Sequence, residues 1–500
     1  MEGSPFAPIC NELAAEFDTA EDTNNIEMTK ELLDKAKKIL ADHDSPEYAP
    51  LFYVVGTSST IERNDLLHNS TDDNPYMDEK VLESQKNVIW YFRHAEELLN
   101  KIEENEETKP YLTGIRMILY VNFGNALDFC ERKCSAMDYY SKALALHPFG
   151  MAFGNIGKAL EHYASLEGDD GHRAILFREA YKYYLKAEQA DDIYTYEKAK
   201  QGFGQKRREM EVRFGKETLM VQGAYTPARP MSGKEYTYRN WCLENSLFLN
   251  TLNDLPEKSD AFMTDALQIT SITTELKQKN PPFVFEMFNQ IKEEYVYSRY
   301  LLYETISVDY RVHFADRETC LEDVLNYSSY SIRIEKMKTA YRTLYSTFDR
   351  IAFLLNAYLK LGLAERDVSY DRIWNRLKEK ESKNGALYAL HWINRDFKEK
   401  FGDADTPQTK KLKNLRNALE HKFVSVHLVP VEKEIEIGED YIYRISEEHF
   451  VDCTMSLLKL VREAIIELTI AIRIEERQRN RDGMKIIKQS LNEYLDEYKV

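Results

Sequence analysis

The sequence has few cysteines and no long apolar run. Its six cysteines are scattered along 500 residues without a CxxC pair or a Cys/His spacing typical of metal ligands, so neither a zinc site nor a disulfide framework is indicated. No apolar run approaches the ~20 residues that a membrane-spanning helix needs. Residues 1–25 are acidic and lack the charged-then-apolar order of a signal peptide. We therefore expect a cytoplasmic protein that binds no membrane, metal or other cofactor.

An excess of basic residues is also missing. Asp and Glu number 84 against 67 Lys and Arg, which gives a formal net charge of -17. Broad nucleic-acid binding requires a positive field, so any contact with RNA or DNA must be local. The 33 Tyr and 23 Phe supply rings for base stacking, although most rings in a helical protein pack its core. With 43% hydrophobic residues, the chain is long enough for two domains with real cores.

The first half contains a spaced pattern of small and large residues around Gly124. The seven matching positions are Tyr120, Phe123, Leu127, Ala136, Tyr140, Ala143 and Pro148. This is the signature of a tetratricopeptide repeat, in which small residues lie where two helices cross and large ones fill the gap. A second copy contains Gly157 and, after an insertion, Tyr184, and a degenerate copy pairs Gly56 with Phe92. One repeat cannot bury its own face, so we expect three or four stacked pairs whose concave face receives a protein or peptide.

Breaks in the helical period predict the domain boundaries. Residues 217–237 carry several glycines and prolines and should link the two halves. We therefore expect an N-terminal segment at 1–25, either loosely ordered or a docked helix, a repeat domain at 26–216, this linker, and a helical domain at 238–500. The fold class is all-α, a tetratricopeptide-like repeat array followed by a helical bundle with a small β excursion.

Periodicity predicts the elements of the second half. Residues 241–255 look extended, and long helices follow at about 282–305 and 335–361. Alternation at 423–429 and 435–445 suggests two strands. A later helix has a seam that either closes the bundle or joins two subunits, formed by Leu458, Val461, Ile465, Leu468 and Ile472.

A basic stretch, KKLKNLRNALEHKFVSVH (410–427), stands out in this acidic chain. Thr406-Pro407 in front of it predicts an N-cap and a proline in the first turn of a helix. On that helix Asn417 and His421 share a face, and Arg416 lies beside Asn417. This trio suits a phosphodiester, because guanidinium binds phosphate in bidentate fashion and imidazole can transfer protons at working pH.

The same Arg-to-His spacing occurs twice more, so context must decide. Arg63–His68 runs into a polar loop, which predicts that its ends lie at a helix terminus. Arg444–His449 should span a strand-to-helix junction. Only the third copy lies in a continuous helical pattern with a basic flank, formed by Lys410, Lys411, Lys413 and Lys422. The alternative interpretation is that Arg416 and these lysines are a solvated helix face and that His421 caps the helix.

Asp349 and Asn356 form a polar pair on an otherwise mostly apolar helix. Most buried polar groups bond a neighbouring element, and this pair can do the same. The other interpretation is that one of the two orients Arg416 or His421 from behind.

Together these features resemble the HEPN superfamily (higher eukaryotes and prokaryotes nucleotide-binding). The hexad RNALEH near the end of a third long helix, the block YRNWCLENSLFLNTLNDL (238–255) and the run FDRIAFLLNAYL (348–359) are similar to a bacterial subfamily that joins tetratricopeptide repeats to a HEPN domain. The likeness covers essentially the whole chain. In that superfamily the arginine and histidine of the hexad are metal-independent ribonuclease residues, which implies this role for Arg416 and His421, with Asn417 as the accompanying polar residue.

The resemblance predicts a metal-independent endoribonuclease that acts on RNA. Cleavage needs an acid and a base, so we expect a homodimer or higher homo-oligomer that brings two histidines together, with the four flanking lysines binding substrate. The family likeness implies a regulated toxin or antiphage defence effector, whose repeats receive a trigger. Two alternatives stay open: a non-enzymatic repeat scaffold, and a nucleotide-binding HEPN partner of a nucleotidyltransferase.

Overall fold

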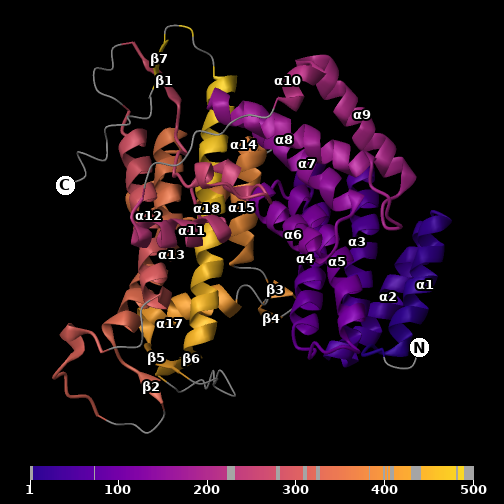
Figure 1. The fold of residues 1–500 in the computed structure, drawn as a ribbon, viewed down its shortest axis with the longest axis horizontal. Helices are drawn as coiled ribbons and strands as arrows, with labels where there is room; N and C mark the ends of the chain where they lie inside the picture. The colour runs from indigo at the N-terminus through magenta and orange to yellow at the C-terminus, as the bar shows by residue number, and fades with distance from the viewer. Residues whose placement is uncertain are drawn as a thin grey trace. The chain divides into compact units, whose positions relative to one another are not determined.

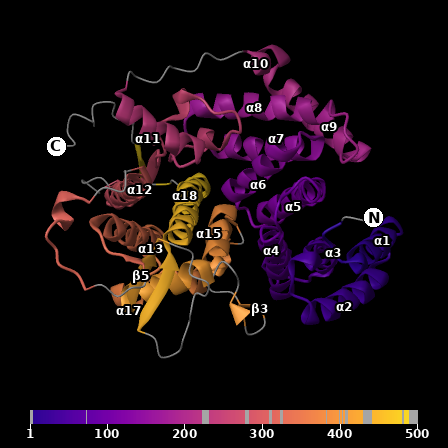
Figure 2. The same ribbon diagram turned by 60° about the horizontal axis from the view of Figure 1, so that its bottom comes forward.

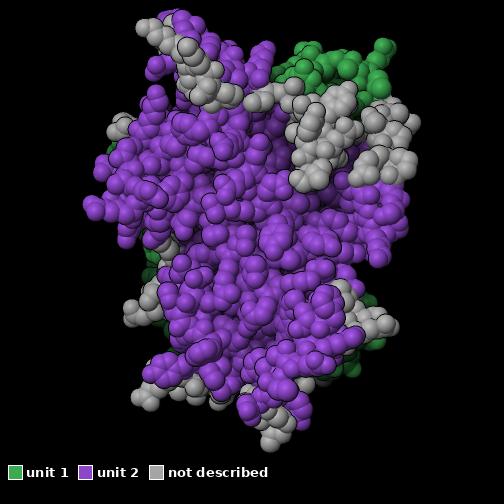
Figure 3. Space-filling view, turned by 90° about the vertical axis from the view of Figure 1, so that its left-hand side faces the viewer, with its two compact units in different colours: residues 1–223, 401–407 green, residues 224–400, 408–500 purple. Residues whose placement is uncertain are grey.

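The chain divides into two compact units in the computed structural model (Figures 1 and 3). Unit 1 contains residues 1–223 and 401–407, and unit 2 contains residues 224–400 and 408–500. The structure describes residues 4–72, 74–221, 231–276, 282–307, 312–322, 327–381, 383–397, 400–401, 404–405, 410–428, 441–479, 482 and 484–488. Helices dominate, which confirms the all-α fold class. In these ranges no helix combines the length and the apolar character that crossing a membrane requires.

Unit 1 is an array of consecutive helices. They are α1 (Pro8–Asp22), α2 (Ile26–Asp42), α3 (Ala49–Asn69), α4 (Glu79–Leu99), α5 (Lys109–Phe129), α6 (Lys133–Leu146), α7 (Gly150–Leu166), α8 (Asp170–Glu188), α9 (Glu197–Phe214) and α10 (Lys216–Met220). The pairs α3 with α4, α5 with α6, and α7 with α8 pack most closely. Of the two possibilities expected for residues 1–25, the docked helix is observed, because α1 buries Leu13 and Phe17.

Each of the three pairs crosses where a glycine faces an aromatic ring. A Cβ atom on Gly124 would lie 2.4 Å from Cε1 of Tyr140, and one on Gly157 would lie 2.9 Å from Cδ1 of Tyr184. Gly56 meets Phe92 in the same way. These are the partners that the sequence pattern predicted. The insertion in the second copy lengthens the two helices rather than the loop, since α7 runs to Leu166 and α8 starts at Asp170.

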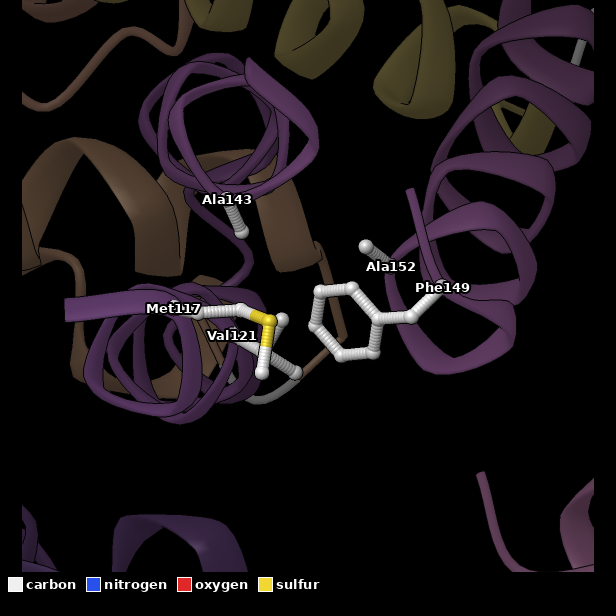
Figure 4. Packing of buried hydrophobic residues seen from close by; sticks show 5 residues of the cluster. All are labelled: Met117, Val121, Ala143, Phe149 and Ala152. Atoms are coloured by element: carbon white, nitrogen blue, oxygen red, sulfur yellow. The ribbon is translucent and has the colours of Figure 1, made fainter. Parts of the chain in front are cut away.

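Buried side chains join successive pairs into one core (Figure 4). Met117 and Val121 of α5, Ala143 of α6, and Phe149 and Ala152 at the start of α7 form one cluster. All five are at most 4% exposed. Neighbouring pairs therefore bury each other's faces, as a repeat array requires.

Unit 2 is a helical bundle around α18 (Glu447–Gln478), against which α12 (Val284–Ser307), α13 (Ile332–Tyr358) and α15 (Gly385–Asp396) pack (Figure 2). The helices predicted at about 282–305 and 335–361 correspond to α12 and α13. The predicted seam from Leu458 to Ile472 is buried on α18, so it closes the bundle of this chain. Shorter helices are α11 (Gly233–Glu244), α14 (Lys378–Glu381) and α17 (Leu415–His421).

The irregular block before α12 is held by two buried arginines. Arg462 of α18 donates to the carbonyl oxygens of Phe248 at 2.6 Å and Asn250 at 2.9 Å. Arg299 of α12 donates to the carbonyl oxygen of Leu247 at 2.9 Å. These bonds tie backbone carbonyl groups of the irregular block to two helices of the bundle. The extended conformation predicted for 241–255 was wrong, because α11, capped by Ser232, continues to Glu244 and a 3-10 helix covers Thr251–Asp254.

Three small sheets complete the described structure. β2 (Ser328–Ser329), β5 (Phe423–His427) and β6 (Ile442–Ser446) form a sheet in which β5 is antiparallel to β2 and parallel to β6. β1 (Ser271–Glu275) pairs with β7 (Met484–Lys488), and β3 (Lys400–Phe401) pairs with β4 (Ala404–Asp405). The prediction of two strands at 423–429 and 435–445 was incomplete, because the sheet contains a third strand, β2, which is distant in sequence. Residues 429–440 lie outside the described part of the chain.

Candidate active site

The predicted motif helix has two parts. A π-helical segment, Lys410–Asn414, leads directly into α17, which ends at His421. The buried face of α17 is formed by Leu415, Ala418 and Leu419. The Tyr341 hydroxyl of α13 donates a hydrogen bond to the carbonyl oxygen of Leu412 in the π-helical segment at 2.7 Å. Single π-helical turns next to an α-helix occur frequently at functional sites. The expected start at Thr406-Pro407 lies outside the described residues.

Arg416 is a half-buried cation at the surface of unit 2. Its Nη1 donates to Oδ1 of Asn417 at 3.2 Å, and its guanidinium carbon lies 5.4 Å from the centre of the Tyr345 ring. Burial raises the pKa of Tyr345, so the ring beneath the guanidinium is neutral at physiological pH. Among the described residues no carboxylate lies within ion-pair distance of Arg416. The guanidinium is thus positioned by an amide and a ring and can still bind an anion.

His421 is the last residue of α17 and is exposed. Asn417 precedes it by four residues and therefore lies on the same helical face. Arg416 precedes it by five residues, which separates their directions by about 140° around the helix axis. One copy of the helix therefore presents the cation and the imidazole on different sides.

The flanking lysines add positive charge to the same surface. Lys411 and Lys413 are half-buried and Lys422 is exposed. For these three side chains the described part of the chain provides no ion-pair partner. The side chain of Lys410 is not among those that the structure describes.

Sequence reasoning missed a cation from a different helix. Arg342 of α13 is exposed, and its Nη2 donates to the carbonyl oxygen of Leu419 at 2.7 Å. This bond ties the Arg342 guanidinium to Leu419, which precedes His421 by two residues on α17. A signal was available in the sequence, because no acidic residue stands three or four positions from Arg342 on its helix. Tyr345, which lies under Arg416, is three positions further along the same face.

Asp349 and Asn356 bond loops rather than the motif helix. Oδ1 of Asp349 accepts from the backbone N–H of Tyr370 at 2.8 Å. Asn356 accepts from the N–H of Leu363 and donates to its carbonyl oxygen, both at 3.1 Å. These contacts favour the structural interpretation of the pair. In the described ranges neither Asp349 nor Asn356 makes a hydrogen bond that would orient Arg416 or His421.

The two other copies of the Arg-to-His spacing lie in different surroundings from the hexad. Arg63 is buried inside α3, where its Nη1 donates to Oε1 of Gln85 at 2.5 Å. The prediction that this copy lies at a helix terminus was therefore wrong for Arg63, because α3 continues well past it. Arg444 lies on β6, and the Ser446 hydroxyl caps α18 by accepting from the N–H of His449 at 3.2 Å. The expected strand-to-helix junction is thus confirmed.

The comparisons with known proteins assign a family to the part of the chain that contains the hexad. Residues 275–475 match the family model described as LA2681-like HEPN. This part of the chain is a HEPN domain. It contains α12, α13, α15, α17 and nearly all of α18, and with them Arg416 and His421. No curated protein and no solved structure matches the chain.

In its described residues the HEPN domain presents cations and an imidazole. Within the described ranges no group of three or more His, Cys, Asp or Glu side chains is arranged to hold a metal ion. The arrangement can bind a phosphate through Arg416 and Arg342 and can exchange a proton through His421.

Proposed function

We propose that the HEPN domain is a metal-independent endoribonuclease with Arg416, Asn417 and His421 at its reacting centre. The observation that carries the proposal is the pairing of a half-buried guanidinium without a carboxylate partner in the described structure and an exposed imidazole on one short helix. Structural arginines in this chain, such as Arg299 and Arg462, are instead buried and donate hydrogen bonds to carboxylates and carbonyl oxygens.

RNA provides its own nucleophile for this chemistry. The 2′-oxygen loses a proton and attacks the adjacent phosphorus, and the bond to the 5′-oxygen breaks as that oxygen gains a proton. The products are a 2′,3′-cyclic phosphate and a 5′-hydroxyl. His421 takes one of the two proton transfers, and Arg416 neutralises the charge that develops on the phosphorane oxygens. Asn417, which accepts a hydrogen bond from Arg416, orients the guanidinium.

Two copies of the chain together supply the acid, the base and the phosphate-binding cation that the reaction needs. A single α17 carries one histidine and directs it about 140° away from Arg416, whereas the reaction needs a base, an acid and a phosphate-binding cation. In an isologous dimer the α17 helices meet across a two-fold axis, and one cleft contains both His421 and both Arg416 side chains. The bound phosphate then lies between cations that would otherwise repel each other.

The surrounding cations concentrate the substrate. Arg342, Lys411, Lys413 and Lys422 border the proposed cleft in a chain whose net charge is -17. Lys410 belongs to the same basic stretch in sequence. A local positive field attracts the phosphate backbone although the whole molecule is acidic. The repeat array of unit 1 is suited to receive a protein or peptide trigger, and a toxin or defence role stays a prediction from the family likeness.

A labelled single-stranded RNA, incubated with pure protein in EDTA, tests the proposal. We expect cleavage by the wild type, a loss of about 10²- to 10⁴-fold in His421→Ala, and a loss of about 10²- to 10³-fold in Arg416→Ala. Exposed His68 and Arg366, whose side chain is 89% exposed, provide the matched controls His68→Ala and Arg366→Ala. Arg63 is unsuitable as a control because it is buried.

The same assay separates the alternatives. Intact RNA in every sample would favour a non-enzymatic scaffold. A protein that binds nucleotide without cleaving RNA would instead match the nucleotide-binding class. Equal cleavage by all five proteins would show that the activity comes from another site or from a contaminant.

A further inference from the structure

Tyr345 of α13 lies beneath the Arg416 guanidinium and is fixed there by two other rings. The ring centres of Phe397 and Phe348 lie 5.4 Å and 6.3 Å from that of Tyr345, and both rings meet it edge-on. Phe348 and Phe397 are at most 4% exposed and pack against each other at 4.9 Å. Edge-to-face contacts in a close-packed interior hold a ring in one rotamer. The Tyr345 ring is therefore a rigid platform where α17 packs on α13 (Figure 1).

Arg416 depends on this platform more than on its own helix. α17 contains seven residues, and helices this short are marginal without tertiary contacts. In the described ranges the guanidinium makes one hydrogen bond, to Asn417 at 3.2 Å, and one ring contact, to Tyr345 at 5.4 Å. Because Asn417 belongs to the same short helix, the contact with Tyr345 is the one of these two that ties the guanidinium to the bundle.

A ring holds an arginine differently from a carboxylate. A carboxylate accepts N–H groups and cancels the charge, whereas the face of a ring attracts the cation and uses none of its N–H donors. Three other arginines of unit 2 that lie over rings, Arg239, Arg299 and Arg479, also pair with a carboxylate. Arg416 has the ring without the carboxylate in the described structure. Its charge and most of its N–H groups therefore stay available to a phosphate.

We propose that Tyr345 is a positioning residue of the ribonuclease site, whose ring aims the Arg416 guanidinium at the phosphate and leaves its charge uncompensated. This inference rests on the proposed function and adds to it a residue that acts through Arg416 without contacting RNA. The ring rather than the hydroxyl has this role, because in the described ranges the Tyr345 hydroxyl makes no hydrogen bond. Since Arg416 stabilises charge that develops in the transition state, misplacing it should lower kcat and change KM little.

Steady-state cleavage of the labelled RNA in EDTA by folded variants tests the inference. We expect Tyr345→Leu, which removes the ring, to lower kcat about 10- to 100-fold with little change in KM. Tyr345→Phe keeps the ring and removes the hydroxyl, so it should cleave like the wild type. Tyr358→Leu is the matched control, because it makes the same substitution on the same helix beneath another arginine, Arg479. It should leave kcat unchanged.

A double-mutant cycle measures whether Tyr345 acts through Arg416. Once the guanidinium is removed, the ring has no cation to position. Tyr345→Leu should therefore lower kcat much less in an Arg416→Ala background than in the wild type. Equal losses in the two backgrounds would overturn the inference, because they would show that Tyr345 affects the reaction independently of Arg416.

The remaining outcomes separate the inference from the proposed function. A wild-type kcat in Tyr345→Leu, or a loss in Tyr345→Phe as large as in Tyr345→Leu, would overturn the inference and leave the cleavage proposal in place. If Tyr345→Leu does not fold, Tyr345→Phe decides: a wild-type kcat supports the role of the ring, and a lowered kcat refutes it. A wild-type protein that does not cleave RNA would refute the proposed function and the inference together.

Discussion

Arg342 of α13 donates a hydrogen bond of 2.7 Å to the carbonyl oxygen of Leu419 in the last turn of α17. The bond satisfies a carbonyl group that lacks an intrahelical partner and fixes a guanidinium close to His421. If Arg342 also contacts the substrate, Arg342→Ala should lower kcat/KM for RNA cleavage about 10- to 150-fold, the effect of one hydrogen bond to a charged group. Arg342→Lys, which keeps the positive charge, should retain more activity than Arg342→Ala.

The control for this prediction is the melting temperature of each Arg342 variant. Loss of the Leu419 contact alone should lower the melting temperature of Arg342→Ala by a few degrees. Arg342→Gln keeps an N–H donor and removes the charge, so it should recover stability without recovering activity. Equal cleavage by wild type and Arg342→Gln would assign Arg342 a purely structural role.

Gly124 tests the helix crossing in the repeat array. Gly124→Ala places a Cβ atom 2.4 Å from the Tyr140 ring, so we expect a loss of about 1–3 kcal/mol in the free energy of unfolding. Gly114 lies on the same helix, and a Cβ atom there has no neighbour within 4 Å. Gly114→Ala should therefore be neutral or stabilise by up to about 1 kcal/mol. Urea unfolding of the two variants measures the difference, and equal values would contradict the crossing.

Long elements with a buried stripe were predictable from the sequence, and contacts between distant segments were not. The seam of α18 and the glycine of α5 are local patterns, since each helix must bury a fixed face. The hexad likewise lies on one helix. Arg342 reaches Leu419 across 77 residues, and β2 joins β5 across a longer interval still. Such contacts depend on how helices pack, which spacing along one helix does not encode.

His94 makes the stability of unit 1 depend on pH. The His94 side chain, whose Nδ1 lies 3.8 Å from Oε2 of Glu97, lowers the pKa of Glu97 to about 2. A carboxyl group whose pKa is lowered on folding stabilises the protein above its ordinary pKa, near 4.5, and loses this contribution as the pH falls towards 2. Glu97→Gln should therefore be less stable than the wild type at pH 6, and the difference should shrink below about pH 4.5.

Urea unfolding of wild type and Glu97→Gln between pH 7 and pH 3 measures this effect. Glu106→Gln, at an exposed position of the same unit, is the control and should show no comparable trend. A difference between wild type and Glu97→Gln that stays constant over the whole range would contradict the assigned pKa of Glu97.

Subunit mixing tests whether two copies share one cleft. When both His421 side chains act in one site, a dimer of wild type and His421→Ala is inactive. An equimolar mixture that has exchanged subunits should then show about half of the wild-type activity per wild-type chain, because half of those chains are paired with the variant. Activity per wild-type chain that does not change with added variant would show that each copy cleaves alone.

The central claim is that Arg416 and His421 promote attack by the 2′-oxygen of RNA. The most direct measurement uses an RNA with a single 2′-deoxy nucleotide at a mapped cleavage position and identifies the fragment ends by mass spectrometry. We expect no cleavage at that position and, at unmodified positions, fragments that end in a 2′,3′-cyclic phosphate and a 5′-hydroxyl. Cleavage at the 2′-deoxy position, or fragments with a 3′-hydroxyl and a 5′-phosphate, would contradict the account.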